Sequence, residues 1–189
     1  MYASLNDNKK SEEYSQKAIA IFTKTKNLRG LSYVYNELGI RYQANQQFQK
    51  ALEYYLKALE WRKILGDKQA LSFTQTNIGD IYFNLGKLDS AYFYFKRSLR
   101  NAEEIKDKLA LSQVYFALGY YYKQKGPEKK AIEYSNKALN CAKEIKYLDF
   151  EERIYQFLSE VYNDLKDPRN AFYYLKLKNE IHDTLYAQN

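Results

Sequence analysis

The sequence is poor in the residues that form disulfides and metal centres. Its 189 residues include one cysteine and one histidine. A single cysteine cannot form an internal disulfide, and one histidine with one cysteine supplies too few ligands for a multi-cysteine zinc site or a two-histidine metal centre. The chain also lacks a glycine-rich phosphate loop. We therefore expect no metal site and no cofactor.

Turn-forming residues and long apolar stretches are also scarce. Two prolines and seven glycines are too few for the many turns of an all-β protein. The longest apolar stretch, Val114 to Tyr122, contains a glycine and is much shorter than the roughly 18 residues of a membrane span. Residues 1–7 lack the basic end and apolar stretch of a secretory signal. We expect a water-soluble chain, with no membrane insertion by this segment.

Charged residues are abundant, but they are not concentrated in one region. Lys and Arg number 30 against 23 Asp and Glu, which gives a net charge of +7. The excess is +4 in residues 1–95 and +3 in residues 96–189. Nucleic-acid-binding proteins gather such charge on one face or in one tail. We therefore expect no nucleic-acid partner.

The sequence repeats itself with a period of 40 residues. Glycine recurs at Gly39, Gly79 and Gly119, with Ser159 in the fourth copy. Further columns hold alanine, tyrosine or aliphatic residues: Ala51, Ala91, Ala131 and Ala171; Tyr14, Tyr54, Tyr94, Tyr134 and Tyr174; Tyr42, Tyr82, Tyr122 and Tyr162; Leu38, Ile78, Leu118 and Leu158. Repetition of this kind is typical of a solenoid, in which stacked units bury a continuous core.

Each unit is predicted to hold two helices, an A helix followed by a B helix. Apolar residues recur at steps of three and four, as in Leu31, Val34 and Leu38, on both sides of a short polar or glycine-containing break. The small Gly39 and Ala51 columns are expected to let the paired backbones approach closely. The A helices are expected near residues 28–45, 68–85, 108–125 and 148–165, and the B helices near 8–26, 48–65, 88–105, 128–145 and 168–185.

These columns resemble the tetratricopeptide repeat (TPR) family, whose pattern runs aromatic, Leu-Gly, Tyr, Ala, aromatic, Ala. The first copy matches it nearly throughout, at Tyr35, Leu38, Gly39, Tyr42, Ala51, Tyr55 and Ala58. The second and third copies match with Ser98 and Ser135 as substitutes, and the fourth departs at Ser159 and Lys178. The resemblance implies an all-α fold, a TPR α-solenoid in which antiparallel helix pairs form a right-handed superhelix.

The resemblance also implies a division of the chain into repeats. We expect TPR 1 at 28–67, TPR 2 at 68–107, TPR 3 at 108–147, and TPR 4 with the C-terminal end at 148–189. Residues 1–27 are expected to form the leading B-type helix of an incomplete repeat. That helix has no A partner, so either the chain was cut from a longer array or a second protomer covers this face in a homodimer.

Two features depart from the usual family pattern. The period is 40 instead of roughly 34 residues. Lys63, Glu103 and Lys143 stand in place of the family's closing proline, so each B helix can run on for about another turn. Extended repeats of this kind occur in kinesin light chains, G-protein-binding scaffolds and quorum-sensing regulators of the Rap type. The closing segment, residues 171–186, looks like the last repeat of TPR arrays in bacterial signalling proteins.

TPR stacks curl so that the A helices line a concave groove. The resemblance places twelve residues on it: Tyr33, Asn36, Ile40, Phe73, Thr76, Asn77, Asp80, Phe83, Gln113, Phe116, Tyr120 and Gln156. The rings are expected to bury apolar side chains of a peptide, and the amides to pair with its backbone. The alternatives are packing of the rings against the neighbouring repeat and plain solvation of the amides. The lysines of the carboxylate clamp found in some TPR domains are missing, so that clamp is not expected.

The expected function is non-catalytic binding of a protein or peptide, in the sensing or interaction segment of a bacterial signal-transduction protein such as a histidine kinase or transcriptional regulator. Two alternatives stay open: a stand-alone scaffold or adaptor, and a peptide-responsive regulator of the quorum-sensing type. The compartment stays open too, periplasmic for an anchored sensor and cytoplasmic for an adaptor. Catalysis is not expected, because Cys141 has no neighbouring histidine in its repeat to activate it.

Overall fold

The computed structural model describes residues 2–186, with side chains from residue 11 onward. This part of the chain is all-α, as expected, and holds nine helices: α1 (Tyr2–Lys24), α2 (Leu28–Ala44), α3 (Phe48–Leu65), α4 (Lys68–Asn84), α5 (Leu88–Ile105), α6 (Lys108–Lys125), α7 (Glu128–Glu144), α8 (Leu148–Asp164) and α9 (Pro168–Tyr186). The ends of the first and last expected units, residue 1 and residues 187–189, lie outside the described residues.

The helix ends lie close to the expected ones because a turn recurs every 20 residues. Each turn holds a residue with positive φ: Lys26, Gln46, Gly66, Gly86, Lys106, Gly126, Lys146 and Lys166. A residue with positive φ is a common way to end a helix. The clearest departure is α1, which begins at Tyr2 instead of near residue 8. No proline or glycine interrupts its sequence, so the helix continues beyond the apolar pattern.

Three of the A helices begin with an acceptor side chain in the same sequence column. Asn27 accepts a hydrogen bond from the Gly30 amide at 2.9 Å, before α2. Asp67 caps α4 in the same way, through the Ala70 amide at 2.9 Å. Asp107 caps α6 through two amides. Each cap satisfies amide groups that have no partner within the helix, so the start of these helices is encoded locally.

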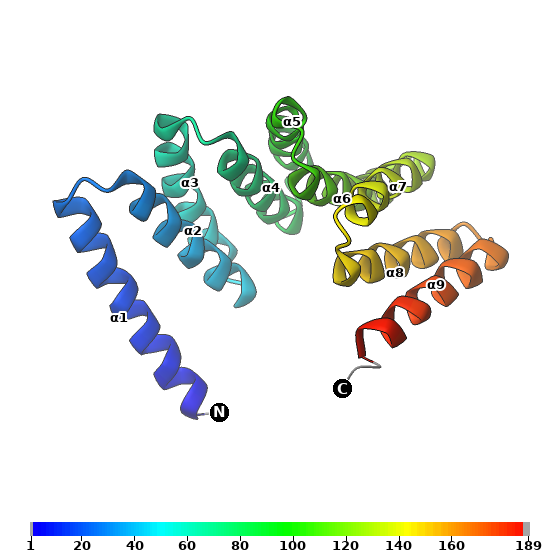
Figure 1. Cartoon of the computed structure of the whole chain (residues 1–189), viewed down its shortest axis with the longest axis horizontal. Helices are drawn as coiled ribbons and strands as arrows, with labels where there is room; N and C mark the ends of the chain where they lie inside the picture. The colour runs from blue at the N-terminus through cyan, green and yellow to red at the C-terminus, as the bar shows by residue number, and fades with distance from the viewer. Residues whose placement is uncertain (1, 187–189) are drawn as a thin grey trace.

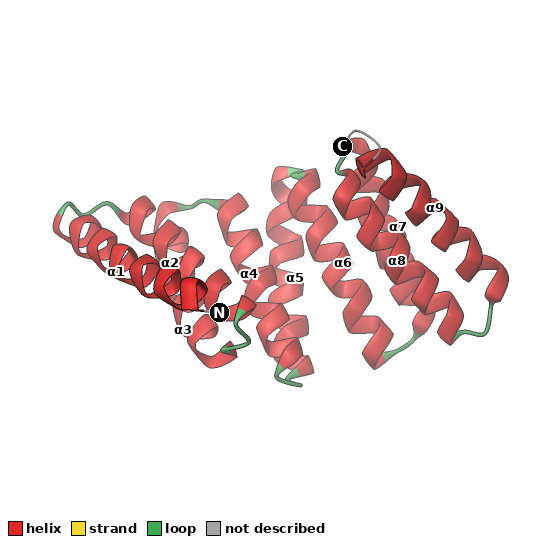
Figure 2. Ribbon diagram, turned by 90° about the horizontal axis from the view of Figure 1, so that it is seen from below, coloured by secondary structure: helices red, strands yellow, loops and turns green. Residues whose placement is uncertain are grey.

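The helices stack in chain order into an arch (Figure 1). Each A helix packs against the B helix that follows it and the B helix that precedes it, and α4 also contacts α6. The A helices α2, α4, α6 and α8 lie on the inner side of the arch, with the B helices outside, and α1 and α9 lie at its two ends. Viewed at 90°, the helices form one continuous row (Figure 2). The A helices therefore present one continuous concave face.

The tyrosine columns form a ladder within the stack. In each repeat a tyrosine of the A helix stacks on one of the B helix, with ring centroids 5.3–5.5 Å apart: Tyr42 on Tyr54, Tyr82 on Tyr94, Tyr122 on Tyr134 and Tyr162 on Tyr174. The aliphatic column at Leu38, Ile78, Leu118 and Leu158 is fully buried beneath it. Eight of the chain's 21 tyrosines thus pack the two helices of a pair against each other.

The glycine column needs a different explanation from the one expected. A Cβ atom on Gly39 would lie 2.5 Å from the Tyr55 ring, and one on Gly79 would lie 2.4 Å from the Phe95 ring. In these two repeats the glycine makes room for an aromatic ring of the B helix. In the third repeat the B helix offers a serine in place of the ring, and the nearest ring atom belongs to Phe157 of α8, at 3.5 Å. Gly119 faces Ser135, and the Ser159 hydroxyl donates a hydrogen bond to the Ala171 carbonyl at 2.8 Å.

Within the described residues, none of the helices combines the length and the hydropathy that crossing a membrane would require.

Candidate functional site: the concave groove

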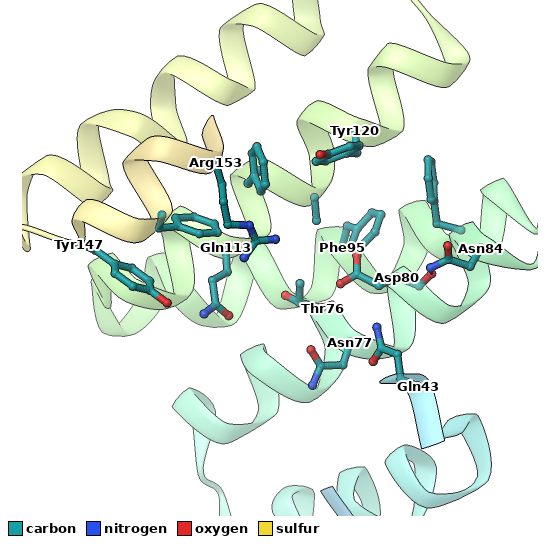
Figure 3. A pocket seen from close by; sticks show the side chains of 14 residues that line it. Gln43, Thr76, Asn77, Asp80, Asn84, Phe95, Gln113, Tyr120, Tyr147 and Arg153 are labelled. Carbon is teal, nitrogen blue, oxygen red and sulfur yellow. The ribbon is translucent and has the colours of Figure 1, made fainter. Parts of the chain in front are cut away.

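The concave face holds two cavities that together form one groove. The larger, of about 850 Å³, lies between α2, α3 and α4, and the smaller, of about 480 Å³, lies between α4, α6 and the start of α8. Gln43, Asn77 and Gln113 line both cavities, so the two lie next to each other on this face. Figure 3 shows the smaller one, which is lined by side chains of the A helices α2, α4, α6 and α8 and by Phe95 of α5. The groove has the dimensions of a ligand pocket.

Eleven of the twelve residues expected on the groove line these cavities. Tyr33, Asn36, Ile40 and Phe73 line the larger cavity, Asn77 and Gln113 line both, and Thr76, Asp80, Phe83, Phe116 and Tyr120 line the smaller one. Gln156 lines neither. It is exposed on α8, where its amide donates a hydrogen bond to Glu160 at 2.9 Å. For Gln156 the structure therefore favours the alternative, a solvated helix position.

Accessibility separates these residues further. Tyr33, Ile40 and Tyr120 are 62%, 43% and 42% exposed and form the open apolar surface of the groove. Phe116 is buried, with its ring centroid 5.2 Å from that of Phe150 and 5.5 Å from that of Phe157. Thr76 is also buried, and its hydroxyl is 2.8 Å from that of Ser98. Phe116 and Thr76 therefore shape the cavity floor and depend on packing against neighbouring helices.

Two charged groups face each other across the smaller cavity. Asp80 projects from α4 and Arg153 from α8, on opposite walls (Figure 3). Burial raises the pKa of the Asp80 carboxyl to about 7, although the positive charge of Arg153 opposes the rise. The Arg153 guanidinium lies 5.3 Å from the Phe150 ring centroid, which favours a cation. The cavity therefore holds a fixed positive charge and a carboxyl that changes charge near neutral pH.

The sequence analysis did not include Arg62, which lines the larger cavity. Arg62 lies on α3 and is 7% exposed. Its Nη1 atom donates hydrogen bonds to Asn36 Oδ1 at 3.0 Å, to the Ala70 carbonyl at 2.9 Å and to the Thr74 hydroxyl. The repeat alignment contained a signal for it, because the same column holds alanine in the next two repeats. A charged residue in a column that holds Phe22, Ala102 and Ala142 at the other junctions marks a departure that packing alone does not require.

Tyr147 and Phe150, at the start of α8, are two further lining residues absent from the expected set. They stack on each other with ring centroids 5.3 Å apart. The family's groove positions lie further along the A helices and did not include these two residues. Tyr147 belongs to the turn before α8, and it lines the cavity from there. Their sequence neighbourhood gave no signal apart from the aromatic residues themselves.

The reactive side chains lie away from the groove. Cys141 is buried on α7, and burial raises the pKa of its thiol, which disfavours the nucleophilic thiolate. His182 lies on α9, where its Nδ1 atom is 3.0 Å from Glu152. Among the residues that the structure describes, no three His, Cys, Asp or Glu side chains are grouped as metal ligands would be. The groove therefore offers binding groups rather than a recognisable catalytic set.

The chain was compared with known families and structures. The tetratricopeptide repeat model matches residues 1–64 and 69–144. Comparison with curated protein sequences finds no match. Among solved structures, BtubC (BKLC) from P. vanneervenii superposes with a TM-score of 0.75 at 19% identity, over 97% of this chain and 79% of BtubC.

Two further structures are similar at comparable identity. MamA from Desulfovibrio magneticus RS-1 superposes with a TM-score of 0.61 at 17% identity, over 93% of this chain and 95% of that one. A Rap protein complexed with Competence and Sporulation Factor superposes with a TM-score of 0.65 at 21% identity, over 94% of this chain and 59% of the Rap chain. At these identities the likeness concerns the fold. Together with the family match, it shows that the chain belongs to the tetratricopeptide repeat family, a family of protein-interaction modules.

Proposed function

We propose that the chain binds an extended peptide or an unstructured protein segment along the concave groove, and that it does so without catalysis. The observation that carries this proposal is that two neighbouring cavities with shared lining residues extend across α2, α4, α6 and α8. Three side-chain amides line the junction between them and can pair with a peptide backbone, while exposed rings on either side can bury apolar side chains.

The comparison with the Rap protein supports a peptide ligand. That structure holds Competence and Sporulation Factor in complex, and its fold matches 94% of this chain. At 21% sequence identity the two proteins share the fold alone, so the proposal for this chain depends on the residues of its own groove. The open and mostly uncharged lining of the larger cavity suits a backbone with alternating apolar side chains.

The test uses exposed groove residues, because their replacement leaves the core intact. Tyr33→Ala and Tyr120→Ala remove rings at the two ends of the groove. Phe93→Ala and Phe172→Ala are matched controls, since these exposed rings lie on the B helices α5 and α9 and line neither groove cavity. Proteins captured from source cells by the wild-type chain are identified by mass spectrometry and then titrated directly. We expect loss of binding in the groove variants only, and equal binding by all four variants would refute the proposal.

We further propose that the groove belongs to the sensing or interaction segment of a bacterial signal-transduction protein. The resemblance of the last repeat to arrays in such proteins supports this setting, with a scaffold or adaptor as the alternative. An immunoblot of fractionated source cells separates the two. A membrane-bound band well above 22.5 kDa supports the sensor segment, and a free band near 22.5 kDa supports the adaptor.

A homodimer through the leading helix also stays a proposal. Helix α1 packs mainly against α2. Its residues Tyr14 and Ile21 are largely exposed. Exposed apolar side chains on a terminal helix are consistent with a second copy covering that face. Light scattering on the purified chain tests this directly, and a monomer at all concentrations would contradict it.

A further inference from the structure

The junction between the first two repeats contains a buried cation that the corresponding later junctions lack. Arg62 stands in the column that holds Ala102 and Ala142, and both alanines are fully buried. Its partner Thr74 stands in the column that holds Val114 and Ile154, which are also fully buried. Two apolar positions of the repeat have therefore been replaced by a polar pair at this one junction.

The buried guanidinium is only partly satisfied. All of its hydrogen bonds within the described residues leave from Nη1, and the buried Nε atom has no acceptor. Glu37 and Asp67 favour the charged form from a distance, but neither lies within the 4.0 Å of an ion pair. Burying a cation without a carboxylate partner is unfavourable, and apolar residues of similar size usually stabilise such a site better. The alanine and valine of the next junction show that this fold does not require the arginine.

Two amide side chains in the larger cavity add free hydrogen-bond donors to the arginine. Asn36 Oδ1 accepts from Arg62 and Gln43 Oε1 accepts from the Tyr55 hydroxyl at 2.7 Å, so the amide NH₂ groups of both side chains remain as donors. Asn36, Gln43 and Arg62 all line the cavity, and no aspartate or glutamate does. A cavity lined by free amide donors and one buried cation, with no carboxylate of its own, is complementary to a carboxylate.

We propose that this cavity binds an acidic side chain, glutamate or aspartate, of a peptide that lies along the groove. The inference rests on the proposed function and adds the chemistry of one subsite. Arg62 comes from the outer layer of helices and reaches between α2 and α4, so it lies behind the concave surface. The groove continues past it on the way to the smaller cavity. A peptide backbone on the surface can reach Arg62 only by inserting a side chain.

The test measures capture of synthetic peptide pools by the immobilised full chain. All peptides have one length and randomised positions, with acetylated and amidated ends, and the central residue is glutamate in one pool and glutamine in the other. A third pool has central glutamine and a free C-terminal carboxylate. We expect the glutamate pool to bind about tenfold or more tightly than the amidated glutamine pool, as for a hydrogen bond to a charged group.

Three variants assign this preference to Arg62. Arg62→Met keeps the volume of the side chain, and Arg62→Ala combined with Thr74→Val copies the apolar junction that the protein already uses at Ala102 and Val114. Both should capture the glutamate and glutamine pools equally. Arg100→Met, on the exposed face of α5, removes the same charge elsewhere and should keep the preference.

Each other outcome overturns the inference in a distinguishable way. Equal capture of the glutamate and glutamine pools refutes the acidic subsite and leaves groove binding in place. A preference for the free C-terminal carboxylate alone refutes the assignment to a side chain. Loss of the preference in Arg100→Met would show a general charge effect. Capture of none of the pools would refute the proposed function together with the subsite.

Discussion

Replacement of Gly79 by alanine tests whether the glycine column exists to seat aromatic rings. The new Cβ atom would lie 2.4 and 2.5 Å from two atoms of the Phe95 ring, which is buried and held by its neighbours. Overpacking of this kind costs about 1–3 kcal/mol, while alanine in a helix gains about 1 kcal/mol over glycine. We expect a net loss of up to roughly 2 kcal/mol, or a fall in Tm of up to about 8 °C.

Gly119→Ala is the matched control in the next repeat. Its Cβ atom would meet the Ser135 hydroxyl at 2.7 Å, and this small group can rotate away. Loss of the Ser135 hydrogen bond to the Ala131 carbonyl, worth about 1 kcal/mol, roughly cancels the gain in helix propensity. Thermal unfolding followed by circular dichroism should therefore show little change for Gly119→Ala.

A double-variant cycle completes the test. In a Phe95→Leu background the ring is gone, so Gly79→Ala should cost nothing or stabilise the chain slightly. The reasoning is refuted if Gly79→Ala and Gly119→Ala have equal effects, or if the loss at Gly79 persists without the Phe95 ring.

Three further predictions concern turns, pH and surface charge. Gly66 has a φ of 65° and open space around its Cα, so Gly66→Ala should destabilise the chain by about 1 kcal/mol through backbone strain alone. Lys106 already has positive φ in the equivalent turn, so Lys106→Ala should have little effect. The urea midpoints of the two variants check this. The pKa of Asp80 is about 7 in the folded chain, against about 4 for an exposed aspartate. Between these pH values the folded chain holds a proton that the unfolded chain has released. The free energy of unfolding therefore falls as pH rises from about 4 to about 7 and then levels off. Asp80→Asn should therefore raise Tm more near pH 8 than near pH 4, and an equal rise at both would contradict the assignment. The Lys68–Glu104 ion pair between repeats is exposed, so Glu104→Gln should change the free energy of unfolding by less than about 1 kcal/mol, and a larger loss would show that the pair does more than a surface contact.

Helix positions could be predicted from the sequence because their determinants are local. The cap residues, the positive-φ turns and the spacing of apolar residues repeat every 20 or 40 positions, and each acts within about one helical turn. The same periodicity placed the A helices on one face, so the groove positions could be carried over from the family pattern. The start of α1 has no glycine or proline to end the helix, and there the expected boundary near residue 8 differed from the observed one at Tyr2.

Burial within the groove could not be predicted in this way. Phe116 and Tyr120 stand one helical turn apart, and both were expected to meet a ligand, yet one is buried and the other is open. Phe157 of the next repeat contacts both rings, whereas Phe150 packs on Phe116, and the approach of these side chains depends on how the repeats pack. Gln156 lies beyond the cavity for a similar reason, since α8 is the last A helix among the described residues and its far side has no A-helix neighbour there.

The sequence determined the period, the helix pairs and the family, since these follow from local spacing and from columns that recur in every copy. Tertiary structure alone decided what each departure from the columns does. Arg62 was visible in the sequence as a charge among alanines, but only the stacking of α2, α3 and α4 shows that it is buried, partly unsatisfied and directed to a cavity without carboxylates. The repeated columns determine the common scaffold. The burial and contacts of a residue that departs from its column depend on the neighbouring helices.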